Sequence, residues 1–182
     1  SPLQILWINL VTDGLPGLAL GVEPPAPDTM TRPPHPPSES VLARGLGVYM
    51  LWVGPLMGLT ALLPELLGVQ TDLHIGGRVW RTMVFTTLCL AQMGNALAIR
   101  SDRLLLAQLG LLSNRPLVGA VLLTFGLQMA VVYLPFMQRI FDTAPLNATL
   151  LLISLGLSSI VFLAVEISKL IGQWRRKKRS AA

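Results

Sequence analysis

An acidic residue stands in the middle of an apolar stretch near the start of the sequence. Asp13 lies beside Asn9 and Thr12 in the segment NLVTDGLPG (residues 9–17), and no lysine or arginine is nearby. Helical residues three and four positions apart are neighbours, so the three side chains lie on or near one face. Carboxylate, amide and hydroxyl groups offer oxygen atoms, the ligands that Ca²⁺ and other hard cations prefer. The spacing therefore favours a site for a hard cation.

The cost of burying charge in a membrane supports this interpretation. An aspartate near the centre of a spanning helix costs about 2.5–3.5 kcal/mol even on lenient insertion scales. Gly14, Pro16 and Gly17 follow directly, and glycine with proline weakens a helix and frees backbone carbonyls. Irregular backbone is tolerated at membrane depth only inside protein or beside a watery cavity. We therefore expect the first helix to be partly unwound at Gly14–Gly17.

Purely structural roles are the alternative explanation of the same residues from spacing alone. A protonated Asp13 could hydrogen-bond to a neighbouring helix. Asn9 and Thr12 could join helices through hydrogen bonds, as polar side chains often do in membranes. Both explanations remain open at this point.

The elements that must position these residues are membrane-spanning helices. The chain has 182 residues, of which 52% are hydrophobic and 13% are charged, and its mean hydropathy is +0.62. A soluble domain would need more charge to cover its surface. Apolar blocks long enough to cross a bilayer recur along the chain, without the alternation of a membrane barrel. We predict an all-α membrane protein, a bundle of five transmembrane helices at residues 2–22, 41–66, 79–99, 116–136 and 148–172.

Basic residues indicate how the helices are oriented. With the segment after the first span in the cytoplasm, the opposite side holds only Arg78, Arg81 and Arg139. The cytoplasmic side then holds Arg32, Arg44, Arg100, Arg103, Arg115, Lys169, Arg175, Arg176, Lys177, Lys178 and Arg179. This asymmetry selects a cytoplasmic C-terminus. We expect the basic tail, residues 173–182, to bind anionic lipids, and we expect no nucleic-acid partner.

Two further features of the sequence are the proline-rich segment and the single cysteine. Residues 23–40 contain seven prolines, which favour a stiff, extended linker, here a cytoplasmic loop. The chain has a single cysteine, Cys89, within an apolar block, and no Cys/His cluster of the kind that binds zinc. We expect Cys89 to be a buried packing residue.

Several segments resemble one known family. The segment PLQILWINLVTDGLPGLALGVEPPAPDTMTRPP resembles the sixth transmembrane helix and following loop of calcium-transporting P-type ATPases, most closely the sarcoplasmic/endoplasmic-reticulum-type pumps and their bacterial relatives. VFTTLCLAQMGNALAIRS is similar to the eighth helix, and NRPLVGAVLLTFGLQMAVVYLP to the ninth. PFMQRIFDTAPL resembles the next outer loop, and FLAVEISKLI the tenth helix. The resemblance covers residues 1–182 as a C-terminal transmembrane module, helices six to ten.

The resemblance implies a set of cation ligands. In the family, an asparagine, a threonine and an aspartate of the sixth helix coordinate calcium, and they match Asn9, Thr12 and Asp13. A glutamate of the eighth helix completes one site in two-site pumps, and its position matches Gln92. Plasma-membrane-type calcium pumps have glutamine there, so the resemblance implies one Ca²⁺ per cycle. Interhelical hydrogen bonding of Gln92 and Asn95 is the structural alternative.

The resemblance also shows what the chain lacks. The phosphorylated aspartate of the D-K-T-G-T motif does not occur in the sequence, nor do the nucleotide-binding and actuator domains. Mg²⁺ and ATP would act only through those missing domains, so this chain alone should not hydrolyse ATP, although the parent pump would. We expect a fragment whose main partner is the N-terminal remainder of the pump, in a bacterial plasma membrane.

Two alternatives differ from a calcium pump. The first is a P-type pump for another cation, such as Mn²⁺, Na⁺ or H⁺. Related sodium-potassium pumps carry aspartate at the position of Asn9, which favours calcium here. The second is a free-standing membrane scaffold module without transport of its own.

Overall fold

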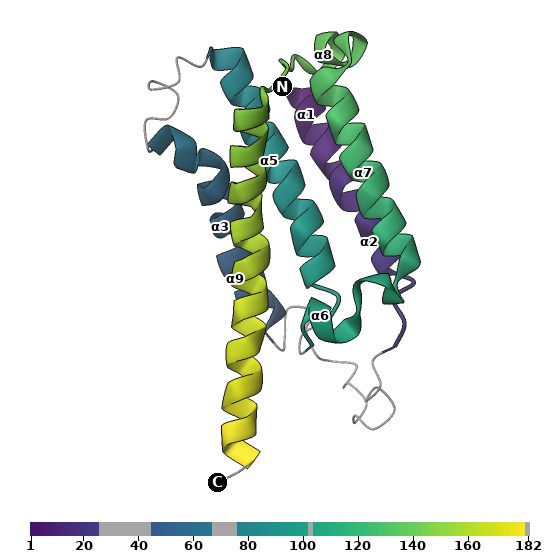
Figure 1. Cartoon of the computed structure of the whole chain (residues 1–182), viewed down its shortest axis with the longest axis vertical. Helices are drawn as coiled ribbons and strands as arrows, with labels where there is room; N and C mark the ends of the chain where they lie inside the picture. The colour runs from purple at the N-terminus through teal and green to yellow at the C-terminus, as the bar shows by residue number, and fades with distance from the viewer. Residues whose placement is uncertain (26–44, 67–75, 102–103, 181–182) are drawn as a thin grey trace.

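The computed structural model describes residues 1–25, 45–66, 76–101 and 104–180, apart from the side chains of residues 65, 66, 176, 177, 179 and 180. Every regular element in these ranges is helical, and the long helices lie side by side in one bundle (Figure 1). The predicted all-α class is therefore confirmed. The predicted proline-rich loop, residues 23–40, lies mostly outside the described residues.

The first helix changes its hydrogen-bonding pattern midway. It begins as α1 (Pro2–Trp7), continues as a π-helical turn, η1 (Ile8–Asp13), and returns to an α-helix in α2 (Gly14–Leu20). The predicted irregularity exists, but its predicted place at Gly14–Gly17 is wrong, because those residues are α-helical. The ring of Pro16 would clash with the carbonyl four residues earlier in a continuous α-helix. The π-turn just before Pro16 relieves that clash by changing the backbone register.

The rest of the described bundle contains four longer helices and three short elements. They are α3 (Leu46–Leu66), α5 (Gly77–Ala98), α6 (Leu106–Leu109), η3 (Leu111–Ser113), α7 (Arg115–Tyr133), α8 (Pro135–Phe141) and α9 (Ala148–Ser180). Helix α7 begins where Asn114 caps it by accepting a 2.9 Å hydrogen bond from the Leu117 N–H. Helix α9 continues past the predicted end of the last span, through Ser180.

Four of the described helices are long and apolar enough to cross a membrane. They are Pro2–Leu20, Leu46–Pro64, Arg115–Tyr133 and Ala148–Arg175. Helix α5, the remaining predicted span, has 22 residues but is not among them. It lies between α9 and the pair formed by the first helix and α7 (Figure 1), and most of its side chains are buried. Contact with protein rather than lipid explains why α5 tolerates polar residues.

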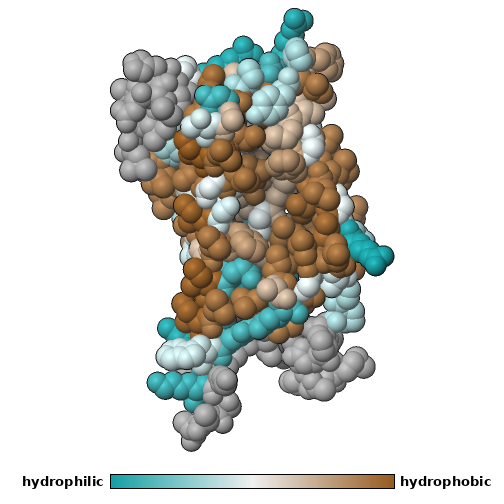
Figure 2. All heavy atoms as spheres, in the orientation of Figure 1, coloured by the Kyte–Doolittle hydropathy of each residue, from teal (hydrophilic) through white to brown (hydrophobic). Residues whose placement is uncertain are grey.

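The surface agrees with a membrane environment. Hydrophobic side chains cover the middle of the molecule, and hydrophilic ones gather toward its two ends (Figure 2). Leu10, Leu51 and Leu152 are 68%, 78% and 67% exposed. Apolar exposure on this scale would be unfavourable in water, whereas lipid tails can cover it.

Helices α5 and α9 form the centre of the bundle. A core cluster joins them to α3 through Val53, Ala91, Ala98, Val161 and Val165. At the end of α5, the Lys169 ammonium of α9 donates a hydrogen bond to the Ala98 carbonyl and pairs with Glu166 at 2.8 Å. A cation at the C-terminus of a helix is favourable. This contact fixes the end of the helix that carries Gln92.

Candidate cation site

Thr12 and Gln92, 80 residues apart in the sequence, meet in the middle of the bundle. Thr12 is 1% exposed within η1, and its hydroxyl oxygen lies 2.6 Å from Gln92 Oε1 and 2.7 Å from the Ile8 carbonyl oxygen. A hydroxyl has one proton, so it can donate fully to only one of these two acceptors. Three oxygen atoms thus converge around a single hydrogen. A cation bound here would take the Thr12 hydroxyl and Gln92 amide oxygens as ligands.

The other two predicted ligands lie on the same turn. Asp13 is exposed in the described chain and lines a groove together with Thr12 and Gln92. Asn9 is also exposed but is not among the residues that line this groove. A π-turn has more residues per turn than an α-helix, so residues three apart, such as Asn9 and Thr12, diverge. The structure therefore brings together Thr12, Asp13 and Gln92, and leaves Asn9 beside them.

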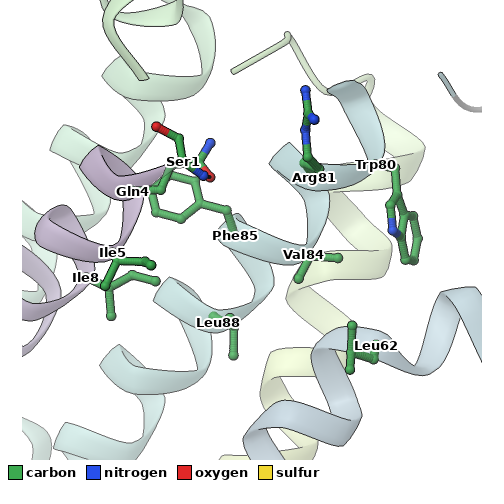
Figure 3. Close-up of a pocket in the computed structure, with 10 residues that line it drawn as sticks. All are labelled: Ser1, Gln4, Ile5, Ile8, Leu62, Trp80, Arg81, Val84, Phe85 and Leu88. Atoms are coloured by element: carbon green, nitrogen blue, oxygen red, sulfur yellow. Dashed lines mark hydrogen bonds between the residues drawn. The ribbon is translucent and has the colours of Figure 1, made fainter. Parts of the chain in front are cut away.

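The groove runs between the first helix and α3, with α5 as its floor. The groove has a volume of about 530 Å³ and is lined by Thr12, Asp13, Pro16, Gly17, Leu20, Leu46, Tyr49, Met50, Val53, Gly54, Met57, Gln92, Asn95, Ala96 and Ile99. A second cavity of about 340 Å³ lies along the same three helices, toward Ser1. There Ile5 and Ile8 of the first helix lie across from Leu62 of α3, with Val84 and Leu88 of α5 between them (Figure 3).

The interhelical hydrogen bonds of the structural alternative are also present. Asn95 accepts a hydrogen bond from the Tyr49 hydroxyl of α3, and Gln92 contacts Thr12. The Asn95 contact joins α5 to α3 without involving a candidate ligand. The Gln92 contact is different, because it places two candidate ligands next to each other. Among the described residues, no group of three or more His, Cys, Asp or Glu side chains is placed to hold a metal.

A buried ion pair that was not predicted from the sequence anchors the end of α2. Glu23 pairs with Arg100, which follows α5, at 2.8 Å, and the Arg100 side chain is 0% exposed. Asn114 donates hydrogen bonds to Glu23 at 2.6 Å and to the Ala19 carbonyl at 3.2 Å. Burial alone would raise the pKa of Glu23, but the hydrogen bonds from Arg100 and Asn114 and the charge of Arg100 outweigh it and lower that pKa. The helix carrying Asp13 is thereby tied to the helix carrying Gln92.

Comparisons with known proteins match most of the chain. The family model for the C-terminus of cation-transporting ATPases matches residues 1–171. A calcium-transporting ATPase of Bacillus subtilis is 36% identical over 159 residues, which are 87% of this chain and 18% of that protein. The human calcium-transporting ATPases type 2C members 2 and 1 are each 36% identical, over 93% and 97% of this chain and 18% and 19% of their own lengths. The chain thus spans less than a fifth of these relatives.

Proposed function

Because the chain belongs to the family of C-terminal regions of calcium-transporting P-type ATPases, we propose that it forms part of the cation pathway of an ATP-driven calcium pump. The observation that carries this proposal is the convergence of Thr12 and Gln92 beside Asp13, in a groove within the bundle. These groups offer oxygen ligands and one carboxylate, a set that suits Ca²⁺. Asn9 completes the proposed ligand set from this chain.

The groove is a surface against which a helix from the N-terminal remainder of the pump could pack. The groove and the second cavity are together lined by residues between Trp80 and Ile99, a span of roughly 30 Å at 1.5 Å per residue, close to the thickness of the hydrocarbon core. A transmembrane helix from the N-terminal remainder would fit along these two hollows and add ligands to Asp13. This chain is then one wall of the cation site.

The chemical step would take place in the parts of the pump outside this chain. Phosphorylation there would shift the pump between two conformations with different cation affinity on the two sides of the membrane. The proline-rich loop, residues 23–40, is the proposed contact to the catalytic domains. The basic tail, residues 173–182, is the proposed contact to anionic lipids on the cytoplasmic side.

The identity of residue 92 affects how many calcium ions the site can hold. An amide oxygen can coordinate a cation but brings no negative charge. With Asp13 as the one carboxylate in the described lining of the groove, this side of the site compensates little of the charge of a second divalent ion. We therefore propose one Ca²⁺ per transport cycle.

The test is the ion dependence of phosphorylation in the complete parent pump. In membranes that contain it, transfer of labelled phosphate from ATP should require Ca²⁺ in the micromolar range. If phosphorylation instead required Na⁺, required Mn²⁺ alone, or depended on pH alone, the transported ion would be Na⁺, Mn²⁺ or H⁺ rather than Ca²⁺. An antibody against the tail should detect a polypeptide several times larger than 19.7 kDa, the mass of this chain. A native product of only that size would favour the scaffold alternative.

A further inference from the structure

A fully buried amide joins three helices outside the cation site. Gln128 of α7 is 0% exposed. Burying an amide is costly unless it is hydrogen-bonded, and here both ends have partners. Gln128 Oε1 accepts a 3.0 Å hydrogen bond from the indole Nε1–H of Trp7, and its Nε2 donates to the Thr86 hydroxyl of α5 at 3.3 Å. One side chain thus connects α7, the first helix and α5.

Trp7 is the residue directly before the π-turn. It ends α1, and Ile8 begins η1. Its indole also packs edge-on against Phe141, with ring centroids 5.0 Å apart. One turn earlier, Gln4 Nε2 donates a 2.9 Å hydrogen bond to the Phe141 carbonyl. The first helix is therefore held against α7 and α8 immediately before the segment that carries the candidate ligands.

The direction in which Thr12 and Asp13 point depends on this anchor. Successive residues of a helix are about 100° apart around its axis, so a modest rotation at Trp7 redirects every side chain of the following turn. A π-turn is rare and is frequently found at functional sites. Beyond it, Asn114 and Arg100 hold Ala19 and Glu23. The turn that carries the candidate ligands is thus held by contacts on both sides, at Trp7 before it and at Ala19 and Glu23 after it.

We propose that Gln128 is a positioning residue of the cation site, which acts through Trp7 to fix the rotation of the π-turn. This inference rests on the proposed function. Gln128 also holds Thr86, six residues before Gln92 on the same helix, so one amide fixes both ligand-bearing helices relative to each other. It makes no contact with Thr12, Asp13 or Gln92 that would make it a ligand itself.

The experiment is a calcium titration of phosphorylation in the complete pump. Gln128→Met keeps the length of the side chain without its hydrogen bonds, and Trp7→Phe removes the donor. Each change should raise the calcium concentration for half-maximal phosphorylation about tenfold. The maximal phosphorylation per pump at saturating calcium should stay unchanged. The double variant should lose less than the sum of the two single losses, because both changes break the Trp7–Gln128 contact.

Matched variants separate positioning from general damage. Gln138→Met makes the same replacement in α8, where the amide donates a 2.7 Å hydrogen bond to the Val132 carbonyl, and it should leave the calcium titration unchanged. Thr86→Ser keeps the hydroxyl and should resemble the unmodified pump, whereas Thr86→Val should not. If Gln128→Met does not accumulate, Trp7→Phe and the two Thr86 variants decide the question.

The outcomes separate this inference from the function on which it rests. An unchanged calcium titration in Gln128→Met and Trp7→Phe, or strictly additive losses in the double variant, would overturn the role of Gln128. The proposed function would survive that result. Phosphorylation of the unmodified pump without any need for calcium would overturn the proposed function, and the inference with it.

Discussion

Thr12 places a buried hydroxyl oxygen beside Gln92, and a substitution there tests whether this oxygen binds the proposed cation. Thr12→Val removes the hydroxyl oxygen and keeps the shape of the side chain. In the parent pump we expect at least a tenfold loss of apparent calcium affinity, because a ligand to a charged group is lost. The calcium titration of phosphorylation measures it.

The matched control for Thr12 is another buried threonine. Thr87 of α5 is 1% exposed, and its hydroxyl donates to the Met83 carbonyl of its own helix at 2.9 Å. Thr87→Val should leave calcium affinity within about twofold, since only a local hydrogen bond is lost. Equal losses in the two variants would show that Thr12 matters for packing alone.

At the level of single residues, the sequence indicated which side chains could bind a cation, but not which side chains contact each other. Oxygen ligands at helical spacing pointed to Thr12 and Asp13 directly. Gln92 was reached only through the family resemblance, because its partner is 80 residues away. The pairing of Glu23 with Arg100 was missed for the same reason, since 77 residues separate them. No local pattern encodes a contact of that range.

At the scale of elements, the Glu23–Arg100 pair should stabilise the joint between α2 and α5. Removing Glu23 leaves the fully buried charge of Arg100 without its partner, which is destabilising. Glu23→Gln should therefore lower the temperature of thermal inactivation of the purified pump. Asp142→Asn is the control, because Asp142 pairs with Arg78 and Arg81 at the surface, where such pairs contribute about 1 kcal/mol or less.

The pH dependence of this joint has a definite sign. Folding lowers the pKa of Glu23 below its ordinary value of 4.5, so ionised Glu23 stabilises the fold above that pH. The contribution is lost as the pH falls from about 4.5 through the lower pKa of the folded state. The stability difference between the unmodified pump and Glu23→Gln should shrink over that range. A constant difference would contradict the role of the ionised carboxylate.

The contact between α5 and α9 depends on a small residue. A β-carbon on Gly94 would lie 3.5 Å from the Phe162 β-carbon, an ordinary contact that leaves no space for more atoms in that direction. Gly94→Ala should be tolerated, whereas Gly94→Leu should reduce the yield of folded pump in detergent. Gly126→Leu in α7 is the control, because nothing lies within 4 Å of its position. Normal yield of Gly94→Leu would contradict this packing.

Helix positions were largely predictable, but their internal register was not. Hydropathy and proline placed the spans close to their observed bounds, as with α7, which starts at Arg115 rather than residue 116. Glycine and proline flagged an irregular first helix without locating the π-turn. The reason is that an α-helical turn and a π-helical turn differ only in which carbonyl each N–H bonds to, four or five residues earlier, and the pattern of residue types does not distinguish the two. The length of α9 was underestimated because basic residues end a span without ending a helix.

At the scale of the whole molecule, the distribution of lysine and arginine predicts the topology. Among the described residues, Arg100, Arg115 and Lys169 lie at the end of the bundle where α2 and α5 finish, and we expect that end to face the cytoplasm. A green fluorescent protein fused after residue 182 of the full pump should fluoresce. Alkaline phosphatase fused after Thr143, which follows α8, should be active because it is exported. The reverse pattern would invert the proposed orientation.

The overall architecture followed from composition, with one exception. Long apolar blocks predicted a helical membrane bundle, and four of the predicted spans meet the length and hydropathy expected of a membrane span. Helix α5 does not, because protein surrounds it and its polar residues face other helices. A central helix is therefore the one that hydropathy describes least well, and it is also the one that carries Gln92.

We propose that this chain supplies ligands to a single calcium ion, with Asp13 as the charged ligand. The most direct measurement is equilibrium binding of radioactive calcium to the purified parent pump and to Asp13→Asn, which removes the charge and keeps the shape. We predict one ion per pump in the unmodified protein and no saturable binding in the variant. Two ions per pump would contradict the single site, and unchanged binding in Asp13→Asn would remove Asp13 from it.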